Sequence, residues 1–483
     1  MNARRFLEAR WAFLVPLVLL IAFFWSAGPI DDDYICFRYG RNWANGLGLV
    51  YNQGERIEGY SQPLWVLICC ACEWCGFVPE LATKLIGTAS ITFALFLVSK
   101  RSSGMAFLLA CLPALGFHAV AGLGTTTFAA LLAGAVATWS WRDEKGWRAL
   151  VPWAFLGVAG LARGEGLLFV LPATAWRLRE RLDPRVLVGW SGYVAWQLVR
   201  VFYYERWIPV TWDVKKLPFL ADLEFGASYL LMGGWSSGYL LLIAALCWLV
   251  WGKKLERPLV PFAIGTFLHL GFVVYVGGDF VQFGRFWVPV VPLVGYLIVC
   301  SERPTASVRR FGFGALVLAA ALVRAWPEGV TVFDKARAET ARWVSIGKEL
   351  DRRLPERARV GTSPIGAIGY YGRRGLVDLL GLTNDKILHS PPDLSIPLKG
   401  HQRTNPVWVL RVRPEVLVLG NGRSFQNEQG RFDLVVSQWE RSLVADPRFG
   451  ALYRQIAMPM PGQEPLLLFV RSDATDLIRD LGR

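Results

Sequence analysis

The sequence predicts a polytopic α-helical membrane protein that ends in a smaller α/β domain. Of its 483 residues 53% are hydrophobic, including 29 Phe and 22 Trp, which exceeds what a single soluble core of this size contains. Several apolar runs are long enough to cross a bilayer. After about residue 326 the pattern changes to short apolar runs that alternate with charged helical segments. We therefore divide the chain into a membrane part, residues 1–325, and a soluble domain, residues 326–483.

The first membrane span is expected at residues 11–28. This run holds 18 uncharged, mostly apolar residues, and it reaches about 27 Å as a helix, enough for the hydrocarbon core. Arg4, Arg5 and Arg10 precede it, so the positive-inside rule keeps the N-terminus in the cytoplasm. Pro29 follows the small residues at which a signal peptide would be cleaved, which favours an uncleaved anchor. The chain therefore leaves the membrane on the extracytoplasmic side.

The remaining spans follow from hydropathy and loop charge. Ten further spans are expected at 81–98, 104–121, 124–140, 149–162, 166–176, 186–203, 228–251, 259–276, 286–300 and 311–325. Simple basic clusters then fall in alternate loops, on the cytoplasmic side. This alternation requires that the short segment 63–77, which contains Glu73, lies in the interface as a helix and does not cross. The result is about eleven spans, with the tail outside the cytoplasm.

Charge and cysteine content exclude several functions. The formal net charge of +14 is explained by cytoplasmic loops that face anionic lipid, so we expect no nucleic-acid partner. All eight cysteines lie at or before Cys300, so the tail has no disulfide. Cys72 and Cys75 form a CxxC without a second pair or a nearby histidine, which favours packing over metal or redox chemistry. The glycine-rich segment 361–369 has neither the Walker pattern nor the Rossmann fingerprint, so we expect no nucleotide binding there.

The tail is expected to be a small α/β domain. A charged helical pattern at 334–353 is followed by β-like runs at Arg359–Thr362, Gly375–Asp378, 416–419 and 466–470. Its 158 residues suffice for an independent core.

Polar residues collect on the extracytoplasmic face of the predicted topology. The first loop, 29–80, opens with three consecutive acids, and later loops on the same side add mixed acids and bases, namely Arg163, Glu165, Lys215, Asp279 and Arg285. Taken singly, each later residue has an ordinary alternative, such as a helix-end ion pair, a headgroup anchor or a helix cap. Three adjacent acids exceed what one cap uses. A rim of this composition favours chemistry beside the lipid, and we expect its members to converge.

The first loop also resembles a known family. Its motif runs Asp31-Asp32-Asp33-Tyr34-Ile35-Cys36-Phe37-Arg38-Tyr39, then Asn42, and then Glu55-Arg56-Ile57-Glu58-Gly59-Tyr60-Ser61. This motif, followed in order by the later polar residues, resembles the AftB-like and ZomB-like group of bacterial GT-C membrane glycosyltransferases. Two positions depart from the group: Asp33 stands where alanine is usual, and Gly124-Thr125 replaces a common Glu-Thr pair.

The resemblance implies a GT-C fold and a membrane glycosyltransferase. The implied donor is a polyprenyl phosphate that carries one sugar, D-arabinofuranose, and the implied acceptor is an extracytoplasmic glycan, lipopolysaccharide or pilin. The implied location is the bacterial inner membrane, multi-pass, with the active face and the C-terminal domain outside the cytoplasm. No cofactor is expected to be required, although adjacent carboxylates could hold Mg²⁺ or Mn²⁺.

The resemblance and side-chain chemistry together assign candidate roles. Asp31 or Asp32 is the expected base for the acceptor hydroxyl, with mutual repulsion raising one pKa. The expected ligands of the donor phosphate are Arg163, Lys215, Arg285 and Arg38. The expected sugar or acceptor ligands are Glu58, Tyr60, Asp279 and Glu165. Lipid-groove candidates are Leu64, Trp65 and Trp74, and Trp408, Trp439, Tyr370 and Tyr371 could be sugar platforms in the tail. A purely structural cap is the alternative role of that domain.

Three other functions compete with this interpretation. One is a GT-C enzyme for another group, such as mannose, aminoarabinose or an oligosaccharide. The second is a non-enzymatic inner-membrane protein required for motility or envelope assembly. The third, a transporter, is disfavoured because the ionisable residues collect at the rim and not at the bilayer midplane.

Overall fold

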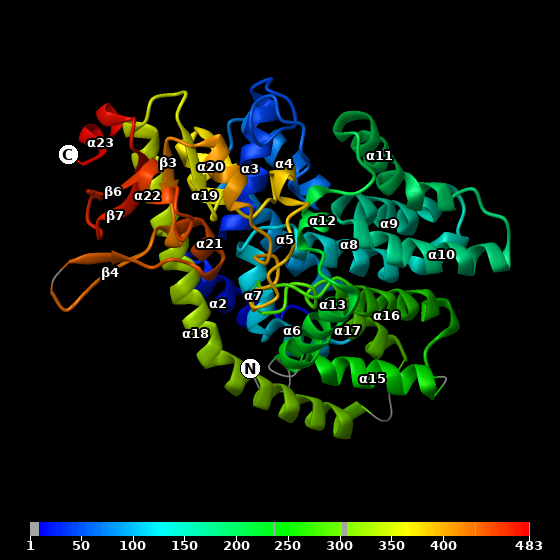
Figure 1. Cartoon of the computed structure of the whole chain (residues 1–483). Coiled ribbons are helices and arrows are strands. Elements are labelled where there is room, and N and C mark those ends of the chain that lie inside the picture. Colours follow the sequence, from blue (N-terminus) through cyan, green and yellow to red (C-terminus); the bar gives the residue numbers. More distant parts are fainter. Residues whose placement is uncertain are drawn as a thin grey trace.

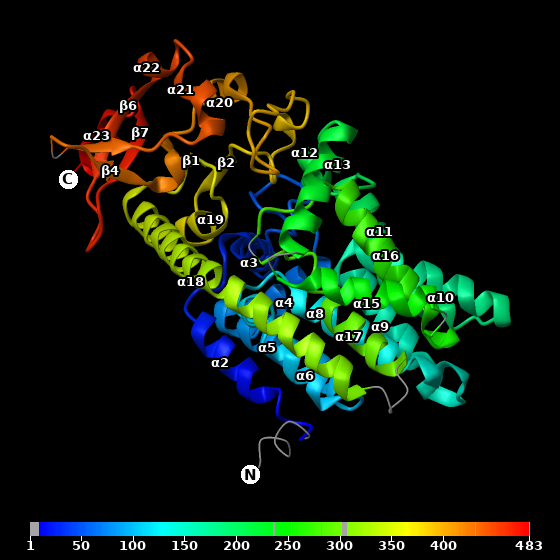
Figure 2. The ribbon, with the colours of Figure 1, turned by 90° about the horizontal axis from the view of Figure 1, so that it is seen from below.

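The computed structural model describes residues 9–234, 237–252, 254–281, 283–301, 307–429 and 431–482, and the side chains of all of these except 307–329. A bundle of helices makes up the membrane part, and an α/β domain lies against one side of it (Figures 1 and 2).

Helices follow the predicted apolar segments closely. The membrane part contains α2 (Leu14–Phe24), α3 (Asp31–Ala44), α4 (Pro63–Trp74), α5 (Pro79–Ser99), α6 (Ser103–Ala110), α7 (Pro113–Val120), α8 (Thr125–Ala137), η1 (Trp139–Asp143), η2 (Gly146–Leu150), α9 (Val151–Ala162), η3 (Gly164–Gly166), α10 (Leu167–Glu180), α11 (Val186–Tyr204), α12 (Val210–Lys215), α13 (Phe219–Ser228), the π-helix η4 (Tyr229–Gly233), α15 (Tyr239–Trp251), η5 (Arg257–Leu259), α16 (Val260–Tyr275) and α17 (Val290–Ser301). The first loop, 29–80, is thus mostly helical, and α4 coincides with the predicted interfacial segment.

Only part of the predicted span count is supported by helix length. Among the described residues, α5 and the segment Arg257–Tyr275 are long and apolar enough to cross a membrane. The helices α6 and α7 pass the same test as a pair, but they are bent by 68° at their junction. Pro113 begins α7 and cannot continue the hydrogen bonding of α6, so the predicted span 104–121 is broken. Six other apolar helices of the described part have only 10–17 residues, and α11, with 19 residues, is not apolar enough by the same measure, so eleven spans stays a prediction.

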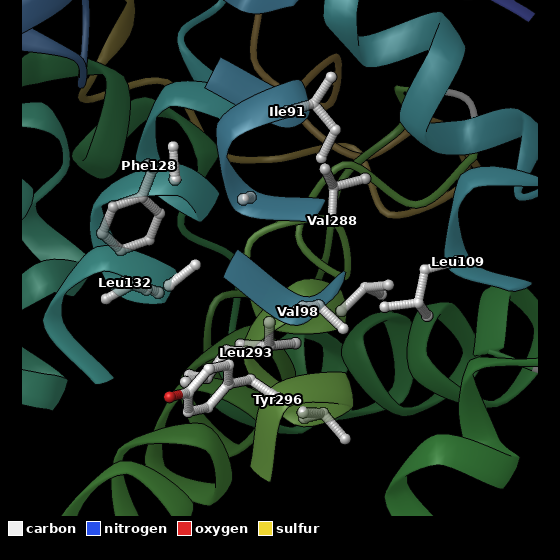
Figure 3. Close-up of a cluster of buried hydrophobic side chains, with 14 of the residues drawn as sticks. Ile91, Val98, Leu109, Phe128, Leu132, Val288, Leu293 and Tyr296 are labelled. Carbon is white, nitrogen blue, oxygen red and sulfur yellow. The ribbon is translucent and has the colours of Figure 1, made fainter. Parts of the chain in front are cut away.

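The membrane part has a closely packed apolar core. Figure 3 shows part of this core, with side chains of α5, α6, α8, α17 and the segment just before α17; the labelled residues are Ile91, Val98, Leu109, Phe128, Leu132, Val288, Leu293 and Tyr296. At Gly87 of α5 an added Cβ would lie 2.2 Å from the carbonyl oxygen of Ala119. Because lipid chains are as apolar as these side chains, such close helix contacts stabilise the bundle mainly through dispersion.

One long helix joins the two parts. α18 (Ser307–Arg353) runs along the bundle and reaches the α/β domain (Figures 1 and 2). It includes both the segment 311–325, predicted as the last span, and the predicted helix 334–353. The boundary expected at residue 326 therefore falls within a continuous helix, and the burial of side chains 311–325 lies outside the described residues.

The α/β domain is built on a five-stranded sheet of order β2-β1-β3-β7-β6. β2, β1 and β3 are parallel, while β7 pairs antiparallel with β3 and β6. The elements are β1 (Arg359–Thr362), α19 (Gly366–Gly372), β2 (Gly375–Asp378), η7 (Asp385–Ile387), α20 (Pro406–Val412), β3 (Val416–Val418), η8 (Gly420–Gly422), β4 (Ser424–Gln426), β5 (Phe432–Leu434), η9 (Gln438–Glu440), α21 (Arg441–Val444), α22 (Phe449–Leu452), β6 (Tyr453–Met458), β7 (Leu466–Arg471) and α23 (Thr475–Leu481). All four predicted strands are present.

The sheet buries both of its faces. Val360 and Val416 pack in one cluster with α18, α19 and the first loop, whereas Leu417 packs on the other face with α20, α21 and α22. This two-sided burial explains why the parallel strands read as short continuous apolar runs. The first loop thereby forms part of the core of the α/β domain.

Candidate functional site

The three acids occupy the first turn of α3 and point in three directions. Successive residues of a helix are rotated by about 100°, so adjacent carboxylates reach different neighbours. Asp31 faces the α/β domain, Asp33 faces the interior of the membrane part, and Asp32 faces a pocket. Their negative charge at a helix N-terminus is favourable, because the helix dipole is positive there.

Asp31 completes the N-terminus of a helix in the α/β domain. Its Oδ1 accepts a hydrogen bond from the backbone N–H of Ala367 at 2.7 Å, and its Oδ2 accepts one from Gly366 at 3.0 Å. Only glycine fits at 366, because an added Cβ would lie 1.8 Å from the carbonyl oxygen of Asp31. Burial raises the pKa of Asp31 to about 7, while the two N–H donors oppose the rise and Asp32 adds a smaller increase. The repulsion expected from the sequence is therefore the lesser cause.

Asp33 is enclosed in the protein. Its Oδ1 accepts hydrogen bonds from the backbone N–H of Leu123 at 3.1 Å and from the indole Nε1 of Trp65 at 2.6 Å. Burial raises the pKa of this carboxyl to about 7, against the lowering effect of both donors. Asp33 thus links α3 to α4 and to the α7–α8 connection beside Gly124, the second position that departs from the family.

We predict that Asp33→Asn raises thermal stability more at pH 8 than at pH 5.5. Burial raises the folded-state pKa to about 7, above the ordinary value of 3.8, so the folded protein holds this proton over a pH range in which the unfolded chain has released it. The contribution of Asp33 to stability is therefore fully present below the unfolded pKa of 3.8 and is lost as pH rises from there to about 7, so the loss is partial at pH 5.5 and complete at pH 8. Asparagine keeps an acceptor oxygen and stays neutral. Melting temperatures of the purified protein at both pH values test this, with a gain of a few degrees at pH 8 expected.

A gain that is equal at both pH values, or larger at pH 5.5, would contradict the titration of Asp33.

Asp32 lines an open pocket between the first loop, later loops and the α/β domain. The pocket has a cavity volume of about 50 Å³, which is space for several water molecules. The residues that line it are Asp32, Ile35, Cys36, Gly59, Tyr60, Ser61, Gln62, Leu123, Thr211, Lys215, Arg285 and Leu382. The Asp32 carboxylate lies 3.9 Å from the Arg285 guanidinium, which also pairs with Asp279 at 2.7 Å. Acid and base from distant segments therefore meet in one partly exposed site.

Arg163 and Glu165 do not line this pocket, but Arg163 packs on the same Phe286 ring as Arg285. Arg163 and Glu165 form a buried ion pair at 2.8 Å, which is the helix-end ion pair that the sequence offered as the alternative to a catalytic role. The guanidinium groups of Arg163 and Arg285 lie 5.3 Å and 5.5 Å from the ring centre of Phe286. The expected convergence of Asp32, Arg163 and Arg285 is thus observed. Among the described residues, no acceptor bonds to the buried Nη1–H of Arg163 or the buried Nε–H of Arg285, which leaves donor capacity beside the pocket.

Several predicted site residues lie elsewhere. The Arg38 guanidinium donates to the carbonyl oxygens of Tyr51, Gly369 and Arg374 and to Asn52, so its donors hold the first loop against the α/β domain. Glu58 is fully buried, in an ion pair with Arg200 at 2.6 Å and a hydrogen bond from Trp196. Neither side chain lines the pocket. Sequence could not reveal most of these partners, because Gly369 and Arg374 lie more than three hundred positions from Arg38, and Trp196 and Arg200 more than a hundred from Glu58.

Among the aromatic and lipid-groove candidates, one lines the pocket and the others lie elsewhere. Tyr60 lines the pocket, with its hydroxyl 2.9 Å from that of Tyr204. Trp65 is buried under Asp33, Leu64 is partly buried beside the membrane core, and Trp74 is 63% exposed. Tyr370 and Tyr371 donate to Glu73 and Glu80 and so join α19 to α4 and α5.

Sequence reasoning missed Gln62, Leu123 and Leu382 as pocket residues. Gln62 and Leu123 carry no charge or motif that would single them out, whereas Leu382 is the last residue of the segment 377–382, which also resembles the family. Within the described part of the chain, no group of three or more His, Cys, Asp or Glu is placed to hold a metal ion. The buried imidazole of His269 lies with its Nε2 2.8 Å from the carbonyl oxygen of Phe286.

The fold is that of a known class of membrane protein. The crystal structure of ArnT from Cupriavidus metallidurans bound to undecaprenyl phosphate matches with a TM-score of 0.50 at 16% identity, covering 77% of this chain and 86% of that one. Its apo structure gives a TM-score of 0.49 at 15% identity over 76% and 85%. The first match shows the GT-C fold, a helical membrane part with a C-terminal α/β domain.

A relative of known activity also matches by sequence. The chain is 24% identical over 413 residues to the terminal β-(1→2)-arabinofuranosyltransferase of Corynebacterium glutamicum, covering 70% of this chain and 57% of that protein. It thus spans little more than half the length of the curated relative. Residues 330–459 match the family described as a domain of unknown function, DUF8728. These findings confirm the resemblance to arabinofuranosyltransferase-like GT-C proteins that the first-loop motif indicates.

Proposed function

We propose that this protein is a membrane glycosyltransferase that moves D-arabinofuranose from a polyprenyl-phosphate donor to an extracytoplasmic glycan or protein. The observation that carries the proposal is the pocket in which the Asp32 carboxylate lies 3.9 Å from Arg285 and shares the lining with Lys215. One carboxylate and two positively charged side chains beside an apolar helix bundle suit a lipid-linked phosphate leaving group. The similarity to the Corynebacterium enzyme supports the choice of arabinose.

Asp32 is the base in this proposal. The acceptor hydroxyl oxygen attacks the anomeric carbon of the donor sugar, and its proton passes to the Asp32 carboxylate. A new carbon–oxygen bond forms while the bond from the anomeric carbon to the phosphate oxygen breaks, so the polyprenyl phosphate leaves with that electron pair. Asp31 is not available for this step, because both of its oxygens accept hydrogen bonds from α19. We assign it instead to positioning α3.

Arg285 and Lys215 bind the phosphate in this proposal. Among the described residues, no acceptor bonds to the buried Nε–H of Arg285 or to the Nη1–H of Arg163, which packs on the same Phe286 ring. Fixed donors of this kind stabilise charge that develops on a departing oxygen more strongly in a buried site than in water. Arginine also offers a planar pair of donors to a phosphate, whereas lysine acts as a point charge. Asp279 holds Arg285 in place.

The polyprenyl chain is proposed to lie along α4, in the interface. Trp74, the exposed member of the lipid-groove candidates, lies at the end of this helix and suits contact with lipid. Trp65 is proposed to act through Asp33, because its indole N–H donates a hydrogen bond to that carboxyl group.

Metal chelation is expected to leave the reaction unchanged. Arg285 and Lys215 already supply positive charge to the leaving phosphate, so a divalent cation is not required in this proposal. Transfer assayed in EDTA, with and without added Mg²⁺ or Mn²⁺, measures this. Loss of activity in EDTA that added Mg²⁺ restores would instead assign a cation to the Asp32 carboxylate.

The function itself is tested with the purified protein in lipid nanodiscs. Radiolabelled polyprenyl-phosphoarabinose is supplied with an oligo-arabinofuranoside acceptor, and transfer of label to the acceptor is expected. Parallel donors that carry mannose or aminoarabinose identify the sugar by competition. If no donor loses its sugar in wild-type protein while an Asp32→Asn strain keeps its envelope phenotype, the protein has a non-enzymatic role.

A further inference from the structure

A row of aromatic rings leads from the pocket to the α/β domain. It consists of Phe280, His401 and Trp439, which we call the aromatic strip. Phe280 and His401 have ring centres 5.2 Å apart, and those of His401 and Trp439 are 4.5 Å apart. The ammonium group of Lys215, which lines the pocket, lies 5.9 Å from the centre of the Phe280 ring. The strip is thus continuous with the pocket.

The strip is held rigidly at its far end. The indole Nε1 of Trp439 donates to the Ser363 hydroxyl oxygen at 3.0 Å, and that hydroxyl donates to the Glu440 carboxylate at 3.0 Å. The other oxygen of Glu440 accepts from the backbone N–H of Gly420 at 2.8 Å. The orientation of the Trp439 ring is therefore fixed before any ligand binds, which reduces the entropy lost on binding.

The same contacts place the strip at the carboxyl end of the parallel strands. Ser363 follows β1 and Gly420 follows β3, so Glu440 joins these two strand ends. β1 and β3 are neighbours, and the connections that follow them lead to opposite edges of the sheet, from β1 to β2 and from β3 toward β6. In open α/β sheets this reversal point is where ligands bind. Glu440 fills the position itself, so a ligand would lie on the partly exposed rings that cover it.

The middle of the strip is anchored to the membrane part. Lys399, two residues before His401, forms a buried ion pair with Asp222, which also accepts from the backbone N–H of Leu217 at 3.0 Å. Arg403 donates to the carbonyl oxygen of Lys216 at 2.9 Å. The loop that carries His401 is therefore fixed against the segment that carries Lys215, and the strip bridges the two parts of the protein.

The chemistry of the strip suits an uncharged saccharide. Burial lowers the pKa of His401 to about 4, so its imidazole is neutral near pH 7 and the strip carries no charge. Sugar rings present apolar C–H faces that pack against aromatic rings, while their hydroxyls stay hydrated at the partly exposed edge. Lys215 lies at the pocket end of the strip, where the phosphate of the donor is proposed to bind.

We propose that the aromatic strip binds the saccharide chain of the acceptor and feeds its terminal hydroxyl into the pocket. This inference rests on the proposed function, because it assumes that the pocket transfers a sugar. It names the acceptor class as a glycan chain and assigns Phe280, His401 and Trp439 to its binding.

The test uses full-length protein in nanodiscs and a linear oligo-arabinofuranoside as probe. Trp439→Ala is expected to raise KM for this acceptor about tenfold and to weaken its direct binding by calorimetry to the same extent, with KM for the donor unchanged. Trp439→Phe keeps a flat ring and is expected to retain most of the affinity. Trp408→Ala is the matched control, since Trp408 packs against the buried cluster that contains Leu417.

The outcomes separate the inference from the proposed function. Wild-type transfer with an unchanged acceptor KM in Trp439→Ala overturns the aromatic strip and leaves the transferase intact. Saccharide binding that depends on Trp439, in a protein that transfers no sugar, supports the strip and overturns the transferase. If wild-type protein binds neither this saccharide nor a mannose oligomer in the calorimeter, the strip is not a saccharide site.

Discussion

Asp32→Asn is expected to lower kcat for sugar transfer by about 10²- to 10⁴-fold, the range that a positioned general base contributes. Asparagine has the same shape but does not accept the proton of the acceptor hydroxyl. The donor should still bind, because removal of a negative charge 3.9 Å from Arg285 does not weaken the attraction between Arg285 and a phosphate. Single-turnover transfer and donor binding, measured separately, distinguish the two effects.

Asp31→Asn is the matched control for that experiment, since it makes the same chemical change one residue away. Its amide oxygen still accepts one N–H from α19, so we expect a much smaller loss in rate. An Asp32→Asn variant with wild-type kcat would refute Asp32 as the base. An equal loss of kcat in both variants would mean that Asp31 and Asp32 contribute equally, and the base would again be either of them.

Arg285→Gln is expected to reduce kcat/KM for the donor by about 10²- to 10³-fold. Removal of one fixed donor that stabilises developing charge costs this much in other active sites. The change also removes the partner of Asp279 and the cation nearest to Asp32. Transfer rates at several donor concentrations measure the loss, and Arg285→Lys, which keeps a point charge, should recover part of it.

Arg206→Gln provides the comparison for Arg285. Arg206 lies in the long loop 204–226 and pairs with Asp213, and its side chain is 31% exposed. We expect little effect on transfer, because exposed ion pairs contribute little and this one does not line the pocket. Similar losses in both variants would mean that charge in the loops matters generally and that Arg285 has no special role.

Sequence reasoning predicted the architecture better than the contacts. The apolar runs and the strands at Arg359–Thr362 and Gly375–Asp378 were predictable, because a two-sided sheet and a helix bundle leave plain hydropathy patterns. The edge strand β6 was missed, since its burial is confined to its ends and its middle reads as polar. The hairpin of β4 and β5 was missed because it is short and mostly exposed.

The sequence predicted which residues lie together in the site, but it did not predict which role each of them has. Loop charge indicated that Asp32, Lys215 and Arg285 would share one face, and they line one pocket. Which of three adjacent acids faces that pocket depends on the rotation of α3, and this is fixed by the partners of Asp31 and Asp33. Those partners, Ala367 and Leu123, are backbone N–H groups and leave no trace in side-chain patterns.

The bond network between α3 and α19 has a consequence for dissecting the protein. A tail expressed alone would lose the carboxylate that satisfies the amides of Gly366 and Ala367, and the carbonyl of Gly369 would lose the Arg38 guanidinium. Tyr51, whose ring packs inside the same cluster as the sheet, would leave a void. Secretion of the isolated C-terminal fragment should therefore give an aggregating product, whereas a fusion that restores residues 29–80 ahead of it should yield a monodisperse one.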